Sequence, residues 1–185
     1  MNTRRSVARS SGSPIQRGTT AGYLIAVLSS LTVIACSAVR SAPPVLLFNT
    51  SMSAPRGWYL LSPEAPTRIG QFALARLPAV AAQLAAARRY LPLGTHLLKA
   101  VAALRGDYVC ADGARVRINR RIVATPLAED SQHRPLDAWR GCLVLPAQHY
   151  FLLSTSNPAS FDSRYFGPLG SESILGRAVP LWTWP

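Results

Sequence analysis

A single lysine and a serine-rich turn are the residues of this 185-residue chain that could do chemistry together. All of the 20 basic residues except Lys99 are arginines, and Lys99 lies in the apolar run between Leu97 and Leu104. An arginine keeps its proton in a protein, whereas a buried lysine can lose it and act as a base. A serine hydroxyl needs such a base to become a nucleophile. The lone lysine in apolar surroundings is therefore a candidate for the base that activates a serine.

Three segments occur in a fixed order after an apolar N-terminal stretch. The turn from Asn49 to Tyr59 reads NTSMSAPRGWY, residues 97–107 carry the lysine before a Gly-Asp turn, and residues 160–168 read SFDSRYFGP. In this order they resemble the bacterial type I signal peptidases, which are membrane-bound Ser/Lys proteases. They are more closely similar to the TraF-type peptidases of conjugative transfer systems. The N-x-S-x-S-x-P-x-G-x-Y form of the turn favours this second group.

The resemblance implies roles for three of these residues. Ser53 matches the nucleophile and Lys99 the base, so we expect Ser53 Oγ and Lys99 Nζ to lie within hydrogen-bond distance of each other. Burial among apolar side chains would lower the pKa of Lys99 from about 10.4 to about 7 or 8. Ser51 matches the hydroxyl that helps to form the oxyanion hole with the Ser53 N–H. Ser51 is also the rival nucleophile.

Three further residues match supporting positions of the family. Ser160 matches the serine that orients the lysine. Asp162 and Arg164 match a pair that braces the site through a charge-assisted hydrogen bond. The alternative for this pair is a purely structural role, and the alternative for the serines is an ordinary turn.

The elements that position these residues are expected to be short strands. Fifteen prolines and twelve glycines favour a mainly β fold of antiparallel sheets with long loops. One short helix is predicted over Pro78–Tyr90, in an insertion after Arg76. Strands are predicted at Val45–Phe48, Gly57–Leu61, Gln71–Leu77, Leu97–Leu104, Arg115–Ile118, Arg121–Ala124, Cys142–Leu145 and His149–Leu153.

The N-terminus predicts attachment to a membrane. Residues 1–17 hold four arginines and no acid, and residues 18–40 form a transmembrane anchor or a signal segment. The positive flank stays in the cytoplasm, which places residues 41–185 in the periplasm as the peptidase domain. Cleavage of the segment and lipidation of Cys36 remain open alternatives.

The cysteines fit an oxidising compartment. Because Cys36 lies in the apolar segment, Cys110 and Cys142 are the pair expected to form a disulfide. Such a bridge would stabilise the fold by roughly 3 to 4 kcal/mol. No His/Cys cluster suggests a metal site, and no cofactor is implied.

The sequence thus favours an inner-membrane serine endopeptidase that faces the periplasm. The resemblance implies that it processes a pilin or another small membrane-protein precursor for conjugative transfer by type IV secretion, with small residues such as alanine near the scissile bond. Hydrolysis and cyclisation both remain open. A non-catalytic component of a pilus or secretion apparatus is the alternative. The net charge of +12 does not favour nucleic acid as a partner, because the arginines are spread along the chain.

Overall fold

The computed structural model describes residues 22–30, 46–154 and 156–184. Residues 22–30 are helical, and Pro43–Pro185 forms a separate compact unit. Within the described ranges, no helix is long and apolar enough to cross a membrane. The predicted basic tail, most of the predicted anchor and Cys36 lie outside the described residues.

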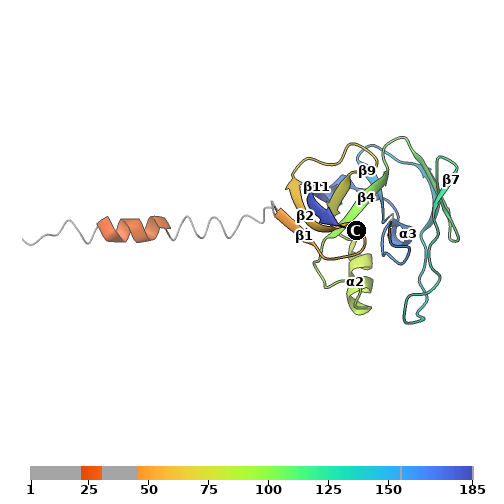
Figure 1. The fold of residues 1–185 in the computed structure, drawn as a ribbon, viewed down its shortest axis with the longest axis horizontal. Helices are drawn as coiled ribbons and strands as arrows, with labels where there is room; N and C mark the ends of the chain where they lie inside the picture. Colours follow the sequence, from red (N-terminus) through yellow and green to blue (C-terminus); the bar gives the residue numbers. More distant parts are fainter. Residues whose placement is uncertain (1–21, 31–45, 155, 185) are drawn as a thin grey trace, which may run out of the picture. The chain divides into compact units, whose positions relative to one another are not determined.

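Seven strands form an antiparallel sheet in the order β1-β2-β11-β3-β4-β9-β10. They are β1 (Leu46–Asn49), β2 (Arg56–Ser62), β3 (Phe72–Ala75), β4 (Leu97–Ala103), β9 (His149–Leu153), β10 (Leu169–Gly170) and β11 (Ile174–Trp184). Figure 1 labels β1, β2, β11, β4 and β9 of this sheet. Along β2 the inward side chains of Tyr59 and Leu61 alternate with exposed ones, as expected for a sheet with one wet face. On β4, by contrast, every residue but Ala102 is buried. This buried strand carries Lys99.

A glycine allows β2 and β11 to approach each other closely. Gly57 has a φ of +133°, and a Cβ built on it would lie 2.1 Å from the carbonyl oxygen of Trp182. No side chain fits in that space. The N-terminal half of β11 also pairs with β3, but that pairing ends at Ala178, so Pro180 removes no N–H from the β3 ladder.

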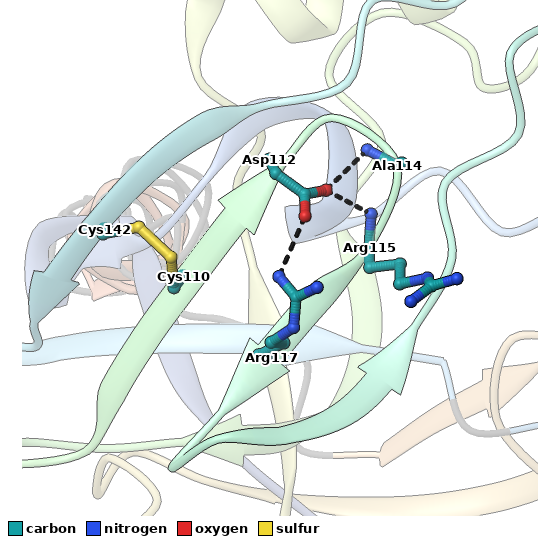
Figure 2. The surroundings of a disulfide bond; sticks show 6 residues. All are labelled: Cys110, Asp112, Ala114, Arg115, Arg117 and Cys142. Carbon is teal, nitrogen blue, oxygen red and sulfur yellow. Dashed lines mark hydrogen bonds and ion pairs between the residues drawn. A yellow bond between two sulfur atoms is a disulfide. The ribbon is translucent and has the colours of Figure 1, made fainter.

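Four strands between β4 and β9 form a second antiparallel sheet in the order β7-β6-β5-β8. They are β5 (Tyr108–Asp112), β6 (Val116–Ile118), β7 (Arg121–Ala124) and β8 (Arg140–Val144). Cys110 lies opposite Cys142 across β5 and β8, and the two form a disulfide (Figure 2). The predicted disulfide is therefore confirmed. A buried apolar cluster that includes Val109, Val116 and Phe151 joins this sheet to β9.

The mainly β prediction is confirmed, with corrections to individual elements. The predicted helix is α2 (Ala79–Ala87), which lies between β3 and β4 but ends three residues before Tyr90. The sequence did not predict β5, β10, β11, the short helix α3 (Ser163–Phe166) or the 3-10 helix η1 (Ser171–Ser173). It also did not predict that β5 to β8 form a separate sheet.

Candidate active site

The turn that connects β1 to β2 carries Ser51 and Ser53, and Asn49 shapes it. The Asn49 side chain is buried, and its Nδ2 donates to the carbonyl oxygens of Ser51, Ala54 and Pro55 at 3.0 Å each. Its Oδ1 accepts hydrogen bonds from the N–H and the hydroxyl of Ser51, at 3.1 and 2.9 Å. One amide side chain therefore satisfies much of the turn's backbone, which leaves Ser53 at its half-buried end.

Lys99 lies on β4 with its side chain in a dry environment. The residue is 3% exposed. Burial lowers the pKa of Lys99 to about 8, while the negative charge of Asp162 opposes this shift and the positive charge of Arg164 adds to it. A substantial fraction of the lysine is therefore unprotonated at mildly alkaline pH, as a general base requires.

Ser160 lies between the lysine and Ser53. Lys99 Nζ donates a hydrogen bond to Ser160 Oγ, and Ser160 Oγ lies 3.1 Å from Ser53 Oγ. Among the described residues, Ser53 and Lys99 form no direct hydrogen bond, so the expected direct contact is replaced by one through Ser160. Ser160 itself is buried, at 3% exposed. The three side chains make a continuous path along which a proton can move.

Asp162 and Arg164 form a buried ion pair behind Ser160. Their side chains meet through Arg164 Nη2 and Nε, at 2.7 and 2.8 Å from the carboxylate oxygens. The same guanidinium donates to the carbonyl oxygens of Pro158, Asn157 and Ser160, at 2.6, 3.2 and 3.0 Å. Asp162 also accepts from the N–H of Ser154 at 3.0 Å. The pair thus fixes the backbone that presents Ser160.

Ser53, Ser160 and Lys99 line one open cavity of about 630 Å³. Ser51 and Asn49 line it as well, so every serine that the sequence singled out reaches this space. The remaining lining is largely apolar or aromatic and comes mainly from the segments around β1, β4, α2 and the link between β7 and β8; it includes Leu47, Phe48, Met52, Leu91, Leu97, Leu127, Leu136 and Phe161. Asp162 and Arg164 do not line it. Such a cavity can hold an extended, mostly apolar peptide next to the serines.

Two residues that support the turn were not singled out from the sequence. Asn49 organises the turn, and the hydroxyl of the fully buried Tyr59 donates to the Pro55 carbonyl oxygen at 2.6 Å. Both occur in the N-x-S-x-S-x-P-x-G-x-Y spacing, which was the available signal. The structure shows no cluster of potential metal ligands within its described part.

Comparisons with known proteins identify the family of this chain. The family model "Signal peptidase, peptidase S26" matches residues 19–184. The chain is 29% identical over 174 residues to a plasmid transfer protein TraF of Escherichia coli, covering 89% of this chain and 95% of that protein. It is 33% identical over 146 residues to a probable conjugal transfer protein TraF of Sinorhizobium fredii, covering 74% and 76%.

A solved signal peptidase I from Enterococcus faecalis is also similar to this chain. It shares 20% sequence identity and superposes with a TM-score of 0.36, covering 62% of this chain and 97% of the solved one.

Proposed function

Because this chain belongs to the signal peptidase S26 family, we propose that it is a serine endopeptidase with Ser53 as nucleophile and Lys99 as general base. The observation that carries the proposal is the path from Ser53 through Ser160 to a buried lysine whose pKa is lowered to about 8. No His/Asp pair is needed for this chemistry, since a neutral amine can accept the serine proton.

The reaction begins when Ser53 Oγ attacks the scissile carbonyl carbon while its proton passes through the Ser160 hydroxyl to Lys99 Nζ. The oxyanion accepts hydrogen bonds from the Ser53 N–H and from the Ser51 hydroxyl, which turns toward it from Asn49. The Lys99 ammonium then protonates the leaving amine as the C–N bond breaks. An ester on Ser53 remains, and either water or a terminal amine of the product releases it.

The substrate we propose is a pilin or another small membrane-protein precursor of a conjugative type IV secretion system. The relatives named for plasmid and conjugal transfer support this choice. The apolar cavity beside Ser53 also suits an uncharged segment near a cleavage site. By family resemblance, small residues such as alanine would flank the scissile bond.

We further propose that the domain works at the periplasmic surface of the inner membrane. The outward faces of β1, β2 and β11 expose large apolar side chains: Leu46, Phe48, Trp58, Leu60, Val179, Leu181, Trp182 and Trp184. Aromatic residues of this kind gather at membrane interfaces. The ring of Phe48 packs 4.8 Å from that of Trp58 and also lines the cavity, so this face would bring the site close to a membrane-bound substrate.

The proposal is tested by expressing the full chain together with the pilin precursor of its transfer system. We expect the wild type to shorten the precursor and Ser53→Ala to leave it at full length. Ser62→Ala is a matched control, because among the residues that the structure describes the Ser62 hydroxyl hydrogen-bonds only to Glu64 on the surface, at 3.4 Å. If Ser53→Ala shortens the precursor as well as the wild type does, Ser53 is not the nucleophile. If the wild type itself leaves the precursor at full length while supporting plasmid transfer, the non-catalytic alternative is correct.

A further inference from the structure

Two connecting segments meet at the cavity away from the reactive serines. Tyr90 lies between α2 and β4, and Asp130 lies in the link between β7 and β8; both line the cavity that Ser53 and Lys99 share. The Tyr90 hydroxyl donates a hydrogen bond to the Asp130 carboxylate. We call this contact the Tyr90–Asp130 latch. It joins parts of the chain that are 40 residues apart.

Asp130 belongs to a small hairpin over residues 128–136. The hairpin is closed by hydrogen bonds from Leu136 N to the Ala128 carbonyl oxygen at 2.8 Å and from Asp130 N to the Arg134 carbonyl oxygen at 3.0 Å. Most of its residues are exposed to solvent. The Asp130 side chain is only 5% exposed. The latch is thus one of the contacts that hold an otherwise exposed hairpin against the body of the domain.

The charge of Asp130 is matched within the latch. Arg134 Nε lies 2.7 Å from the Asp130 carboxylate, and the Arg134 guanidinium lies over the Tyr90 ring at 5.6 Å. Arg88 Nη1 donates to the Pro135 carbonyl oxygen at 2.7 Å. Because its counterion is already in place, Asp130 does not call for a cationic group on a ligand.

The latch connects to an apolar wall beside the reactive serines. The Tyr90 ring packs 5.6 Å from that of Phe161, which directly follows Ser160. Phe161 stacks on Tyr165 at 5.4 Å, and the Tyr165 hydroxyl accepts the Leu127 N–H at 3.0 Å. Leu127, Phe161 and the hairpin's Leu136 all line the cavity. These three residues are the wall.

We propose that the wall binds an apolar side chain of the peptide substrate at some distance from the scissile bond, and that the Tyr90–Asp130 latch sets its position. The inference rests on the proposed peptidase function only in identifying the ligand as a peptide. Tyr90 and Asp130 are then positioning residues for specificity. Burying one leucine side chain against this wall would favour binding at least about tenfold over a serine.

The test measures binding without turnover, in the full-length Ser53→Ala protein in detergent. The probes are a fluorescein-labelled ten-residue peptide with alanines at the central bond and leucines at the outer positions, and the same peptide with serines replacing the leucines. Fluorescence anisotropy gives the two dissociation constants. We expect the leucine peptide to bind at least about tenfold more tightly.

Adding Tyr90→Phe or Asp130→Asn should reduce this preference several-fold, and Leu136→Ser should reduce it directly. Glu129→Gln is the matched control, because Glu129 is the next carboxylate on the same hairpin, is 54% exposed and, within the described part of the chain, forms its ion pair only with His133. Tyr90→Phe removes a single hydroxyl. If this variant melts at the same temperature as the parent protein, a reduced preference does not result from unfolding.

An unchanged preference in Tyr90→Phe and Leu136→Ser, or no preference in the parent protein, would overturn the inference. Cleavage of the leucine peptide by the wild type is measured separately. If the preference is present and depends on the latch but the wild type cuts no peptide or precursor, the proposed function fails and the binding wall stands.

Discussion

At the scale of single residues, the proposed peptidase activity depends on the protonation of Lys99. Its pKa is lowered to about 8 by burial, and only the neutral amine can accept the Ser53 proton. We therefore predict that kcat/KM for peptide cleavage rises with pH and levels off above a midpoint near 8. Rates measured from pH 6 to pH 10 check this. A rate that is flat over that range would mean that Lys99 is not the base.

The same burial makes Lys99 costly for the fold. The pKa of Lys99 is about 8 in the folded chain against a reference of 10.5, so the cost is fully present below pH 8 and disappears as the pH rises to 10.5. We predict that Lys99→Met abolishes cleavage but stabilises the fold by about 2 to 3 kcal/mol at pH 7, after the lost hydrogen bond to Ser160 is counted. Urea unfolding at pH 7 and pH 10 measures this difference, which should shrink at the higher pH. If Lys99→Met is instead less stable than the wild type at pH 7, burial of the Lys99 ammonium does not lower the stability of the fold.

At the scale of elements, charged residues in the segment from β9 to α3 shift the pKa of Lys99. The Asp162 charge raises the pKa of Lys99, and the Arg164 charge lowers it. We predict that Asp162→Asn moves the midpoint of the pH–rate profile below that of the wild type, and that Arg164→Met moves it above. The opposite signs separate electrostatic tuning from a general loss of structure.

The matched control for this prediction is Asp112→Asn. Asp112 also pairs with an arginine, Arg117 at 2.9 Å, but in the second sheet, where Figure 2 shows it beside the disulfide. It should leave the midpoint unchanged. Both Asp162→Asn and Arg164→Met should be less stable than the wild type by about 3 to 5 kcal/mol, because each leaves a buried charge without its counterion. Equal midpoints in all variants would contradict the tuning.

The strands of this fold were predictable where apolar runs lie between turn signals, as in β2 and β4. For β4 the flanking Gly-Thr and Arg-Gly-Asp segments indicated a strand, although its alanines favour a helix. β11 was missed because Pro180 interrupts its pattern. A proline is tolerated there because the β3 pairing ends at Ala178 and the register against β2 shifts between Pro180 and Trp182. β5 was missed because its middle residues, Cys110 and Ala111, have weak strand preference. Short strands of this kind are fixed by their partners, which local sequence does not reveal.

At the scale of the whole molecule, the disulfide holds the second sheet and the hairpin that it carries. Cys110 and Cys142 are 32 residues apart, and their bond closes a loop that includes residues 128–136. We predict that a Cys110→Ser/Cys142→Ser double variant loses roughly 3 to 4 kcal/mol of stability, chiefly through the entropy of the unfolded chain. Urea unfolding of the oxidised wild type and the variant measures the loss. Identical midpoints would show that the sheet needs no covalent support.

The site itself could be predicted only in part. The unusual lysine suggested its own chemistry, but Ser53 and Ser160 are 107 residues apart, and only family resemblance brought them together before the fold was known. The position of Ser160 between the serine and the lysine depends on the Arg164 contacts with residues 157–160. The role of Asn49 likewise follows from the shape of a turn. Such contacts become visible only in three dimensions.

The central claim is that Ser53 forms an acyl-enzyme, and trapping that intermediate tests it most directly. The full-length protein is mixed with a peptide substrate, quenched in acid and examined by intact mass spectrometry and peptide mapping. We predict a mass increase equal to the acyl half of the substrate, located on Ser53 and absent in Ser53→Ala and Lys99→Met. An adduct on Ser51, or cleavage that continues in Lys99→Met, would contradict the account.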